Sequence, residues 1–324
     1  MIALLLSVLV SPAFAIEVVC TLPHLGDIAH RIAPDAHVVT LARGADDPHF
    51  LSPTPALIAQ VAKADVYVEN GLNLELWSER LLDTAGNPRI RPGQPGYVKS
   101  TDGVIRLEVP TDLTRAKGDL HPEGNPHVWT DPLNAIQIGD NIAAGLSRVD
   151  APNAAKYAAN AKAFRTDVET HYFGADLVGF MGGDLLLRLE QQKKLDAFLA
   201  GKGLTARVGG WKKDGAPLNG KPVVFYHQSW AYFVDRFGIR VAGYVEDRPG
   251  IPPTAAHRDQ LISLIKSSAV HVIEVTNYYD DGVPKLLAQA TGAKVAHTPG
   301  NVGGTPDATD YFAYITSMIK AFNQ

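Results

Sequence analysis

Residues 16–42, IEVVCTLPHLGDIAHRIAPDAHVVTLA, contain the pattern that decides the fold. Residues 16–22 form an apolar run that predicts a strand, residues 24–33 have the periodicity of a helix, and residues 37–42 predict a second strand. Continuous apolar strands that alternate with helices are typical of a parallel sheet with helices on both faces. This stretch therefore predicts an α/β fold.

The same alternation continues along the first half of the chain. It predicts helices at 56–64 and 74–82 and a strand at 65–69. Residues 84–126 are rich in Gly and Pro and are expected to be largely loops. Asp131 is the expected N-cap and Pro132 the first residue of a helix over 132–149, and an Ala-rich helix follows over 152–172.

The alternation then begins again. The second half predicts strands at 223–227, 239–245, 270–276 and 294–298, and helices at 230–237, 255–268, 284–290 and 307–322. We therefore expect two parallel-sheet α/β lobes, 16–131 and 173–324, joined by a long helical region over 132–172. The join is expected to be rigid because no Gly/Ser tract separates the lobes. The stretch 171–219 has no assigned role.

Composition excludes several classes of protein. The chain has 324 residues, a formal net charge of −4, 46% hydrophobic residues and one cysteine, Cys20. The apolar content is sufficient for a packed core, and the near-neutral charge gives no reason to expect nucleic acid as a partner. One cysteine excludes an internal disulfide and a Cys-based metal site. Metal chemistry would therefore fall to the carboxylates and the 11 histidines.

The N-terminus has the pattern of an export signal. Residues 2–10 are apolar and precede Ala13-Phe14-Ala15, so we interpret 1–15 as a signal peptide, although no Lys or Arg precedes the run. The alternative is a buried N-terminal strand. Val19 stands where a lipoprotein signal needs a small residue, so Cys20 is expected to be a buried free thiol. We expect a periplasmic protein that is soluble once mature.

Enzyme and nucleotide motifs are weak. Residues 215–221 have P-loop spacing, but Pro222 replaces the Ser or Thr that would hold magnesium, and the segment precedes a predicted strand instead of following one. Ser229 lacks the strand-to-helix elbow of a hydrolase nucleophile.

Three histidines stand at the ends of predicted elements. His49 follows the second strand, His127 precedes the capped helix, and His227 ends the strand 223–227. Ligands of open parallel sheets bind beyond the carboxyl ends of strands. Three imidazoles held by rigid elements in a cleft between lobes would suit a borderline ion such as zinc.

The other histidines carry weaker signals. A surface or structural role is expected for His30, His171 and His271, and with less certainty for His24. His121 lies in a Gly/Pro loop, where a solvent-exposed position is favoured over a role in metal capture.

The sequence segments around the three histidines resemble those of the metal-binding receptors of zinc and manganese ABC importers, the periplasmic cluster A-I solute-binding proteins. The shared motifs are Asp47-Pro48-His49 followed by SPTP at 52–55, NPHVWTDP at 125–132 and YHQSWAYF at 226–233. The segments 69–77 and 248–253 also resemble the family, and 125–132 is the most specific element. The likeness covers essentially the whole mature chain.

The resemblance implies a fold, a function and a site. The fold is two α/β lobes joined by a long rigid helix, with the metal in the cleft between them. The function is high-affinity capture of a divalent metal in the periplasm and delivery to an ABC importer permease in the inner membrane, by a monomer with no catalytic residues. The implied ligands are His49, His127 and His227. Manganese-type members tend to have a carboxylate at the third position, so His227 favours zinc as the cargo over manganese.

The sequence departs from the family pattern in two respects, and it leaves two alternative functions open. The family often takes a fourth ligand from an Asp in the last loop, but residues 297–304 contain no acid, which leaves water, Asp47 or the 277–281 loop. A metal-collecting loop before His127 is short, DLHPE at 119–123. A three-His zinc site also occurs in hydrolytic enzymes, which need a general base that no spacing here reveals. A metal-binding surface adhesin with the same fold is the second alternative.

Overall fold

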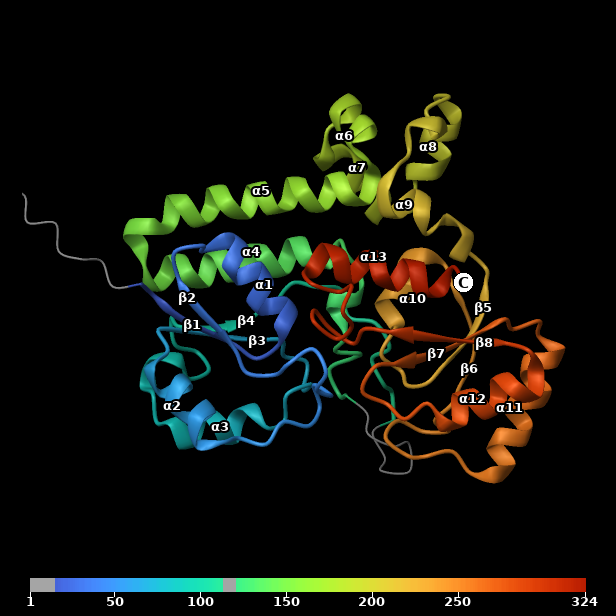
Figure 1. Cartoon of the computed structure of the whole chain (residues 1–324). Coiled ribbons are helices and arrows are strands. Elements are labelled where there is room, and N and C mark those ends of the chain that lie inside the picture. The colour runs from blue at the N-terminus through green and yellow to red at the C-terminus, as the bar shows by residue number, and fades with distance from the viewer. Residues whose placement is uncertain (1–14, 113–120) are drawn as a thin grey trace, which may run out of the picture.

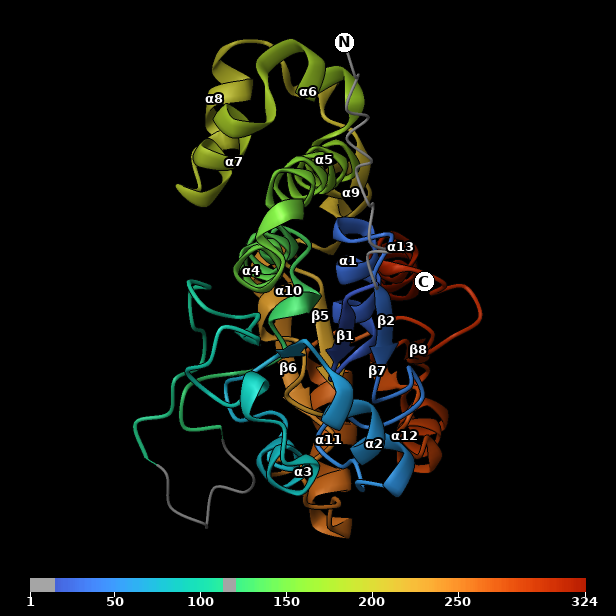
Figure 2. The ribbon, with the colours of Figure 1, turned by 90° about the vertical axis from the view of Figure 1, so that its left-hand side faces the viewer.

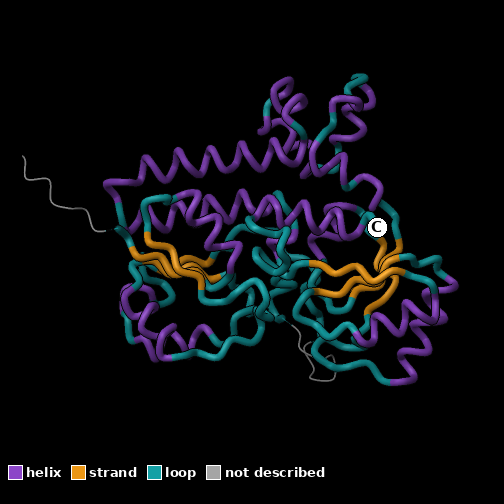
Figure 3. Tube along the Cα trace, viewed as in Figure 1, coloured by secondary structure: helices purple, strands orange, loops and turns teal. Residues whose placement is uncertain are grey.

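Two α/β lobes lie side by side in the computed structural model, which describes residues 15–112 and 121–324 (Figure 1). The expected signal peptide therefore falls outside the described residues except for Ala15. Each lobe is built on its own four-stranded parallel sheet, and the two sheets are separate (Figure 3). The predicted two-lobe α/β architecture is confirmed.

The two sheets have the same strand order. The strands of the N-terminal lobe are β1 (Glu17–Cys20), β2 (His37–Thr40), β3 (Val66–Glu69) and β4 (Tyr97–Lys99), in the order β2-β1-β3-β4. Those of the C-terminal lobe are β5 (Pro222–Phe225), β6 (Arg240–Tyr244), β7 (Val272–Thr276) and β8 (Lys294–Thr298), in the order β6-β5-β7-β8. Strand β4 was missed because its three residues lie among the glycines and prolines of 84–126, too short a run to show alternation.

Alternate residues of each strand face different layers of helices. In β1, Val18 and Cys20 face the helices α1 (Pro23–Ile32) and α4 (Asn134–Val149). Val19 faces the opposite layer, which contains α2 (Pro55–Lys63) and α3 (Ser78–Ala85). This two-residue period is the one that a strand imposes on its side chains. Cys20 is buried and free, as predicted, and burial raises the pKa of its thiol.

The C-terminal lobe repeats this arrangement. Val223 and Phe225 of β5 pack on the side of α10 (Ala231–Phe237) and α13 (Tyr311–Phe322). Val224 packs on the side of α11 (Ala255–Ser267) and α12 (Gly282–Thr291).

The largest of the hydrophobic clusters runs through both lobes. It joins residues of β1 and α1 to those of α13 and β5 through α4 and α5 (Ala154–Phe173). Helix α5 has 20 residues, so it is about 30 Å long and spans the upper side of the molecule (Figure 1). The expected rigid helical bridge is therefore present, and it is packed into the core that the lobes share.

The start of the bridge differs from the prediction. Helix α4 begins at Asn134, after a 3-10 turn over Val128–Thr130, instead of at Pro132. Asp131 still caps the backbone just before α4, because its Oδ1 accepts a hydrogen bond from the Leu133 amide at 2.9 Å. Its carboxylate also forms an ion pair with Arg236, which the sequence did not reveal.

Three short helices project beyond the C-terminal end of α5, away from both sheets (Figure 1, Figure 2). They are α6 (Ala175–Met181), α7 (Gly183–Gln191) and α8 (Leu195–Gly201). A fourth short helix, α9 (Gly210–Asp214), packs against α5, and its Trp211 is buried. The four helices account for most of the stretch 171–219 that had no assigned role. In the described part of the chain, no helix has the length and apolar character needed to cross a membrane.

A buried ion pair connects the two lobes behind the cleft. Arg236 of α10 donates to both carboxylate oxygens of Asp131, at 2.8 and 2.7 Å. Glu190 of α7 lies 3.6 Å from the same guanidinium and also accepts from Lys212. Both partners of the Asp131–Arg236 pair are largely shielded, with side-chain exposures of 8% and 16%. The projecting helices are thus tied to the joint between the lobes.

Removing the charge of Asp131 is predicted to destabilise the protein substantially. Asp131→Asn leaves the Arg236 guanidinium buried with only Glu190 near it, which costs about 3 kcal/mol, the lower end for a broken buried pair. Urea unfolding measures the change in the free energy of unfolding. The control is Asp176→Asn, which breaks the exposed Asp176–Arg207 pair and costs less than about 1 kcal/mol. Equal losses in the two variants would contradict the structural role of Asp131.

Candidate metal centre

Three of the predicted ligands come together between the lobes. His49 lies in the loop after β2, His127 immediately precedes the 3-10 turn that leads to α4, and His227 lies two residues beyond β5. The ring centres of His49 and His127 are 5.2 Å apart, those of His49 and His227 are 5.5 Å apart, and those of His127 and His227 are 6.1 Å apart. Imidazoles bound through Nε2 to one tetrahedral zinc ion have ring centres about 5 Å apart.

The nitrogens that face the cluster lack partners. His127 is 1% exposed and His227 is 8% exposed. The Nε2 atoms of His49 and His127 are buried without a hydrogen-bond partner in the described part of the chain. A buried polar atom of this kind costs free energy unless something satisfies it. Two imidazoles with buried nitrogens that lack a partner, beside a third ring, are therefore suited to bind an electrophile such as a metal cation.

Each ring is oriented through its other nitrogen. The Nδ1 of His49 lies 2.7 Å from Asp47 Oδ1, that of His127 lies 2.9 Å from Asn125 Oδ1, and that of His227 lies 2.7 Å from Glu246 Oε2. Since these oxygens can only accept, each Nδ1 donates, and Nε2 is the nitrogen that remains to bind a ligand. Such partners fix the orientation of metal-binding histidines.

His121 is a fourth member of the cluster. Its ring centre lies 5.3 Å from that of His49 and 6.3 Å from that of His127. The ring is half-buried, and its Nδ1 lies 3.0 Å from the carbonyl oxygen of Asn73. The favoured solvent-exposed position was therefore wrong. The loop sequence gave no signal for this, because the contact comes from a segment 48 residues earlier in the chain.

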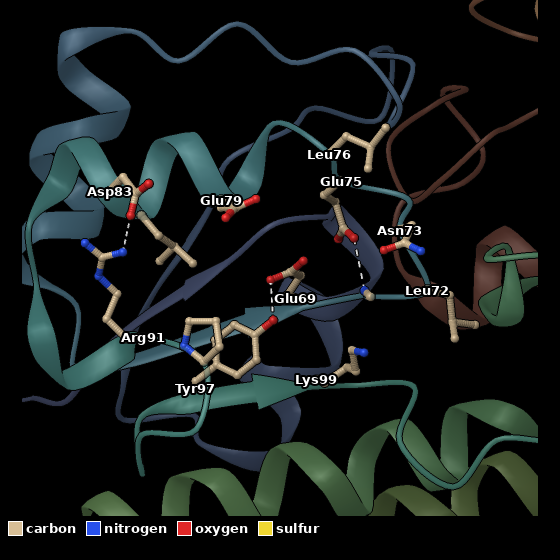
Figure 4. A pocket seen from close by; sticks show the side chains of 13 residues that line it. Glu69, Leu72, Asn73, Glu75, Leu76, Glu79, Asp83, Arg91, Tyr97 and Lys99 are labelled. Carbon is tan, nitrogen blue, oxygen red and sulfur yellow. Dashed lines mark hydrogen bonds and ion pairs between the residues drawn. The ribbon is translucent and has the colours of Figure 1, made fainter. Parts of the chain in front are cut away.

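The segment that holds His121 is itself fixed by a buried carboxylate. Glu75 accepts hydrogen bonds from the amides of Asn70 and Gly71, at 2.8 and 3.0 Å, at the floor of a pocket in the N-terminal lobe (Figure 4). Burial, together with the charge of Glu69, raises the pKa of Glu75 to about 8. The Asn70 side chain in turn donates to the carbonyl oxygen of Pro126, next to His127. This network connects β3 to two of the four rings.

The other candidates for a fourth ligand are engaged elsewhere. Asp47 is occupied by His49. In the 277–281 loop, Asp281 pairs with Lys285 and lies 3.7 Å from His297, and Asp280 accepts from the Gly282 amide. His121 is the candidate whose ring lies beside those of two predicted ligands, His49 and His127.

The loop that carries His49 is packed against the C-terminal lobe. The Gly44 carbonyl accepts from the side chain of Asn277 at 3.2 Å. A Cβ at Gly44 would lie only 2.3 Å from the Val302 carbonyl oxygen, so the two backbones can approach this closely only because residue 44 is glycine. This contact fixes His49 relative to the lobe that supplies His227.

The surroundings shift the pKa values of two groups of the cluster, His127 and Asp47. Burial lowers the pKa of His127 well below its ordinary value, and the neighbouring histidines lower it further. Burial alone would raise the pKa of Asp47, but the hydrogen bond and charge of His49 outweigh it and the pKa is lowered. The centre thus combines a ring that burial keeps uncharged, His127, with an ionised carboxylate, Asp47, on the outer nitrogen of His49.

The rings are close to a coordinating geometry without reaching it. In residues 15–112 and 121–324, no group of three or more His, Cys, Asp or Glu side chains is placed to hold a metal ion as it stands. Binding would therefore require the rings to turn so that their Nε2 atoms converge on one point.

Comparison with known proteins places the chain in a family. The family model for ZnuA, described as the periplasmic component A of a zinc-uptake complex, matches residues 18–171 and 202–324. The chain belongs to the ZnuA family. The unmatched residues 172–201 contain α6, α7 and α8, so these projecting helices are an addition to the family pattern. The ZnuA family is one of uptake receptors, not of enzymes.

Individual relatives differ in the metal that they are named for. The iron-binding protein YfeA of Yersinia pestis is 24% identical over 86% of this chain and 75% of its own length. The zinc-binding lipoprotein AdcA of Streptococcus pneumoniae is 22% identical over 86% of this chain. The zinc-uptake protein ZnuA of Brucella abortus is 28% identical over 52% of this chain. The matches span less than half the length of AdcA and of the Brucella protein, 48% and 40%.

Solved structures confirm the fold. A crystal structure of ZnuA superposes with a TM-score of 0.69 over 95% of this chain and 97% of that chain, at 22% identity. A zinc-bound ZnuA lacking its residues 138–173 gives the same TM-score.

One further histidine beside the centre gives a prediction about pH. His24 is fully buried, stacks on Trp129 with ring centres 4.6 Å apart, and binds Asn301. Burial lowers its pKa to about 3, although the hydrogen bond to Asn301 raises it slightly. The unfolded chain therefore binds this proton more tightly than the folded one, and stability is lost as the pH falls from 6.5 towards 3. The loss due to His24 is about 2 kcal/mol at pH 5.

Chemical unfolding of the wild type and His24→Gln between pH 7 and 5 tests this linkage. The variant is expected to lose less stability than the wild type over that range, and the imidazole resonances of His24 should show no protonation above pH 4. Parallel stability profiles would show that His24 titrates normally.

Proposed function

We propose that this protein is a receptor that captures zinc in the periplasm and delivers it to an ABC importer permease in the inner membrane. His49, His127 and His227 are the proposed zinc ligands, and His121 is the proposed fourth. The observation that carries the proposal is the convergence of four histidine rings, each with its Nδ1 on an oxygen, at the join of two lobes. Residues 16–131 and 173–324 are the proposed lobes, with 132–172 as the bridge.

The donor set favours zinc over manganese. Imidazole nitrogen suits zinc, whereas carboxylate and carbonyl oxygens suit manganese. The two nearest carboxylates, Asp47 and Glu246, bind Nδ1 atoms and are not free to face the ion. The family membership supports uptake of a divalent transition metal, and its relatives include proteins named for zinc, manganese and iron.

A hydrolytic role is not supported by the same arrangement. A general base must lie within hydrogen-bond reach of the bound water. Asp47 and Glu246 are used to orient rings, and the remaining carboxylate near the cluster, Glu108, is exposed and bound to Asn125. We therefore propose no catalytic residue. The adhesin alternative gains no specific support from the structure.

Removing one ligand is predicted to weaken zinc binding strongly. His227→Ala should lower zinc affinity by at least about 100-fold, because even the partners of zinc-bound histidines contribute 10- to 100-fold. Competition with a chromophoric zinc chelator measures the change. His271→Ala, at an exposed histidine outside the cluster, is the matched control and should bind as the wild type does.

His121→Ala tests the fourth ligand separately. A loss of tenfold or more is expected if His121 coordinates the ion, whereas an unchanged affinity would assign the fourth position to water. Unchanged affinity in His227→Ala would refute the proposed site as a whole.

The native cargo is predicted to be zinc. Protein purified from its own compartment, with zinc and manganese both present during growth, should contain about one zinc and no manganese per chain. Elemental analysis gives the stoichiometry, and titration of the metal-free protein with one metal in the presence of the other gives the selectivity. One manganese per chain would overturn the assignment of zinc.

A further inference from the structure

A small cavity leads from the solvent to the histidine cluster. Its volume is about 50 Å³, and its lining includes His121, His127 and His227. A water molecule occupies about 30 Å³ in the liquid, so the cavity has room for a cation that has kept one or two waters. Among the described residues that line it, Glu108 is the one carboxylate.

Glu108 is held in place on the outer side of this cavity. Its Oε2 accepts a hydrogen bond from the Asn125 side-chain amide at 2.9 Å, while Oε1 has no hydrogen-bond partner in the described part of the chain. The oxygen of the same Asn125 side chain binds the Nδ1 of His127. One amide group therefore connects a carboxylate at the surface to a buried ring of the cluster.

The backbone of Glu108 adopts a conformation that is uncommon for residues other than glycine. Its φ is 50°, in the left-handed region. Such a conformation persists only where surrounding contacts impose it, and it is concentrated at functional sites. Here the Leu107 carbonyl accepts from the Asn125 amide at 2.8 Å, and the Leu107 amide donates to the Tyr232 hydroxyl at 3.3 Å. These contacts to both lobes hold the carboxylate at the mouth.

We propose that Glu108 is a capture ligand, which takes the hydrated divalent cation at the mouth of the cavity and passes it to the histidines. This inference rests on the proposed function. The step exchanges ligands only: a carboxylate oxygen replaces a water on the cation, and imidazole nitrogens then replace the carboxylate and the remaining waters. Each ring takes the cation through Nε2 in its neutral form.

Charge explains why a capture ligand is useful here. A neutral imidazole attracts a distant cation weakly, whereas a carboxylate attracts a divalent ion over several ångströms. At about 6 Å in water this attraction is worth about tenfold in the local concentration of the ion, and therefore in the association rate constant. The effect weakens with salt, since the screening length is about 10 Å at 0.1 M ionic strength.

Stopped-flow mixing of the metal-free protein with zinc ions alone tests the proposal. Tryptophan fluorescence provides the signal, because Trp129 lies 5.3 Å from the His127 ring. Glu108→Gln keeps the size of the side chain and removes the charge. We expect its association rate constant to fall about tenfold at low salt, the deficit to shrink at high salt, and the dissociation rate constant to stay equal or fall.

Glu79→Gln is the matched control, because Glu79 is exposed and lies outside this cavity, in the pocket of Figure 4. It makes the same change in net charge and should bind zinc at the wild-type rate. An unchanged association rate in Glu108→Gln would overturn the proposal. A faster dissociation would also overturn it, since that result identifies a permanent ligand.

The failure of this inference is distinguishable from failure of the proposed function. If His227→Ala abolishes tight zinc binding while Glu108→Gln associates normally, the receptor function stands and the capture role is wrong. If His227→Ala binds zinc as the wild type does, the site itself is wrong.

Discussion

The centre depends on a hydrogen bond that is made twice in the same way. In Asp47-Pro48-His49 and in Asn125-Pro126-His127, the side-chain oxygen two residues before the histidine accepts from both its backbone amide and its Nδ1. The short side chain folds back on its own backbone, as Asp and Asn do in turns, and proline restricts the residue between. Each tripeptide therefore orients its ring with little help from the rest of the fold.

The third and fourth rings are oriented by distant segments. His227 depends on Glu246, which follows β6, and His121 depends on the carbonyl of Asn73, which follows β3. The relative placement of all four then rests on the shared core and on the close packing of Gly44 against the opposite lobe. The lobes are already packed together, and the rings need only turn to bind a small ion. Little conformational entropy is therefore lost on binding.

The projecting helices show how an addition is accommodated without disturbing the site. Residues 172–201 lie outside the family pattern, yet Glu190 approaches the buried Asp131–Arg236 pair. Asp131 belongs to the same NPHVWTDP segment that supplies His127. The projecting helices therefore support the joint between the lobes through the contact of Glu190 with Arg236.

The sequence by itself determined the two α/β lobes, the buried free Cys20 and the three histidines at element ends, because strand and helix periodicity and the Asx-Pro-His turns are local. It did not reveal the three-residue strand β4, too short to show a period, nor the Asp131–Arg236 pair, whose members lie 105 residues apart. It also placed His121 in solvent. Only the tertiary structure decided that position and the contacts of Glu246 with His227 and of Glu108 with Asn125, because each joins segments distant in the chain, and periodicity carries no information about such contacts.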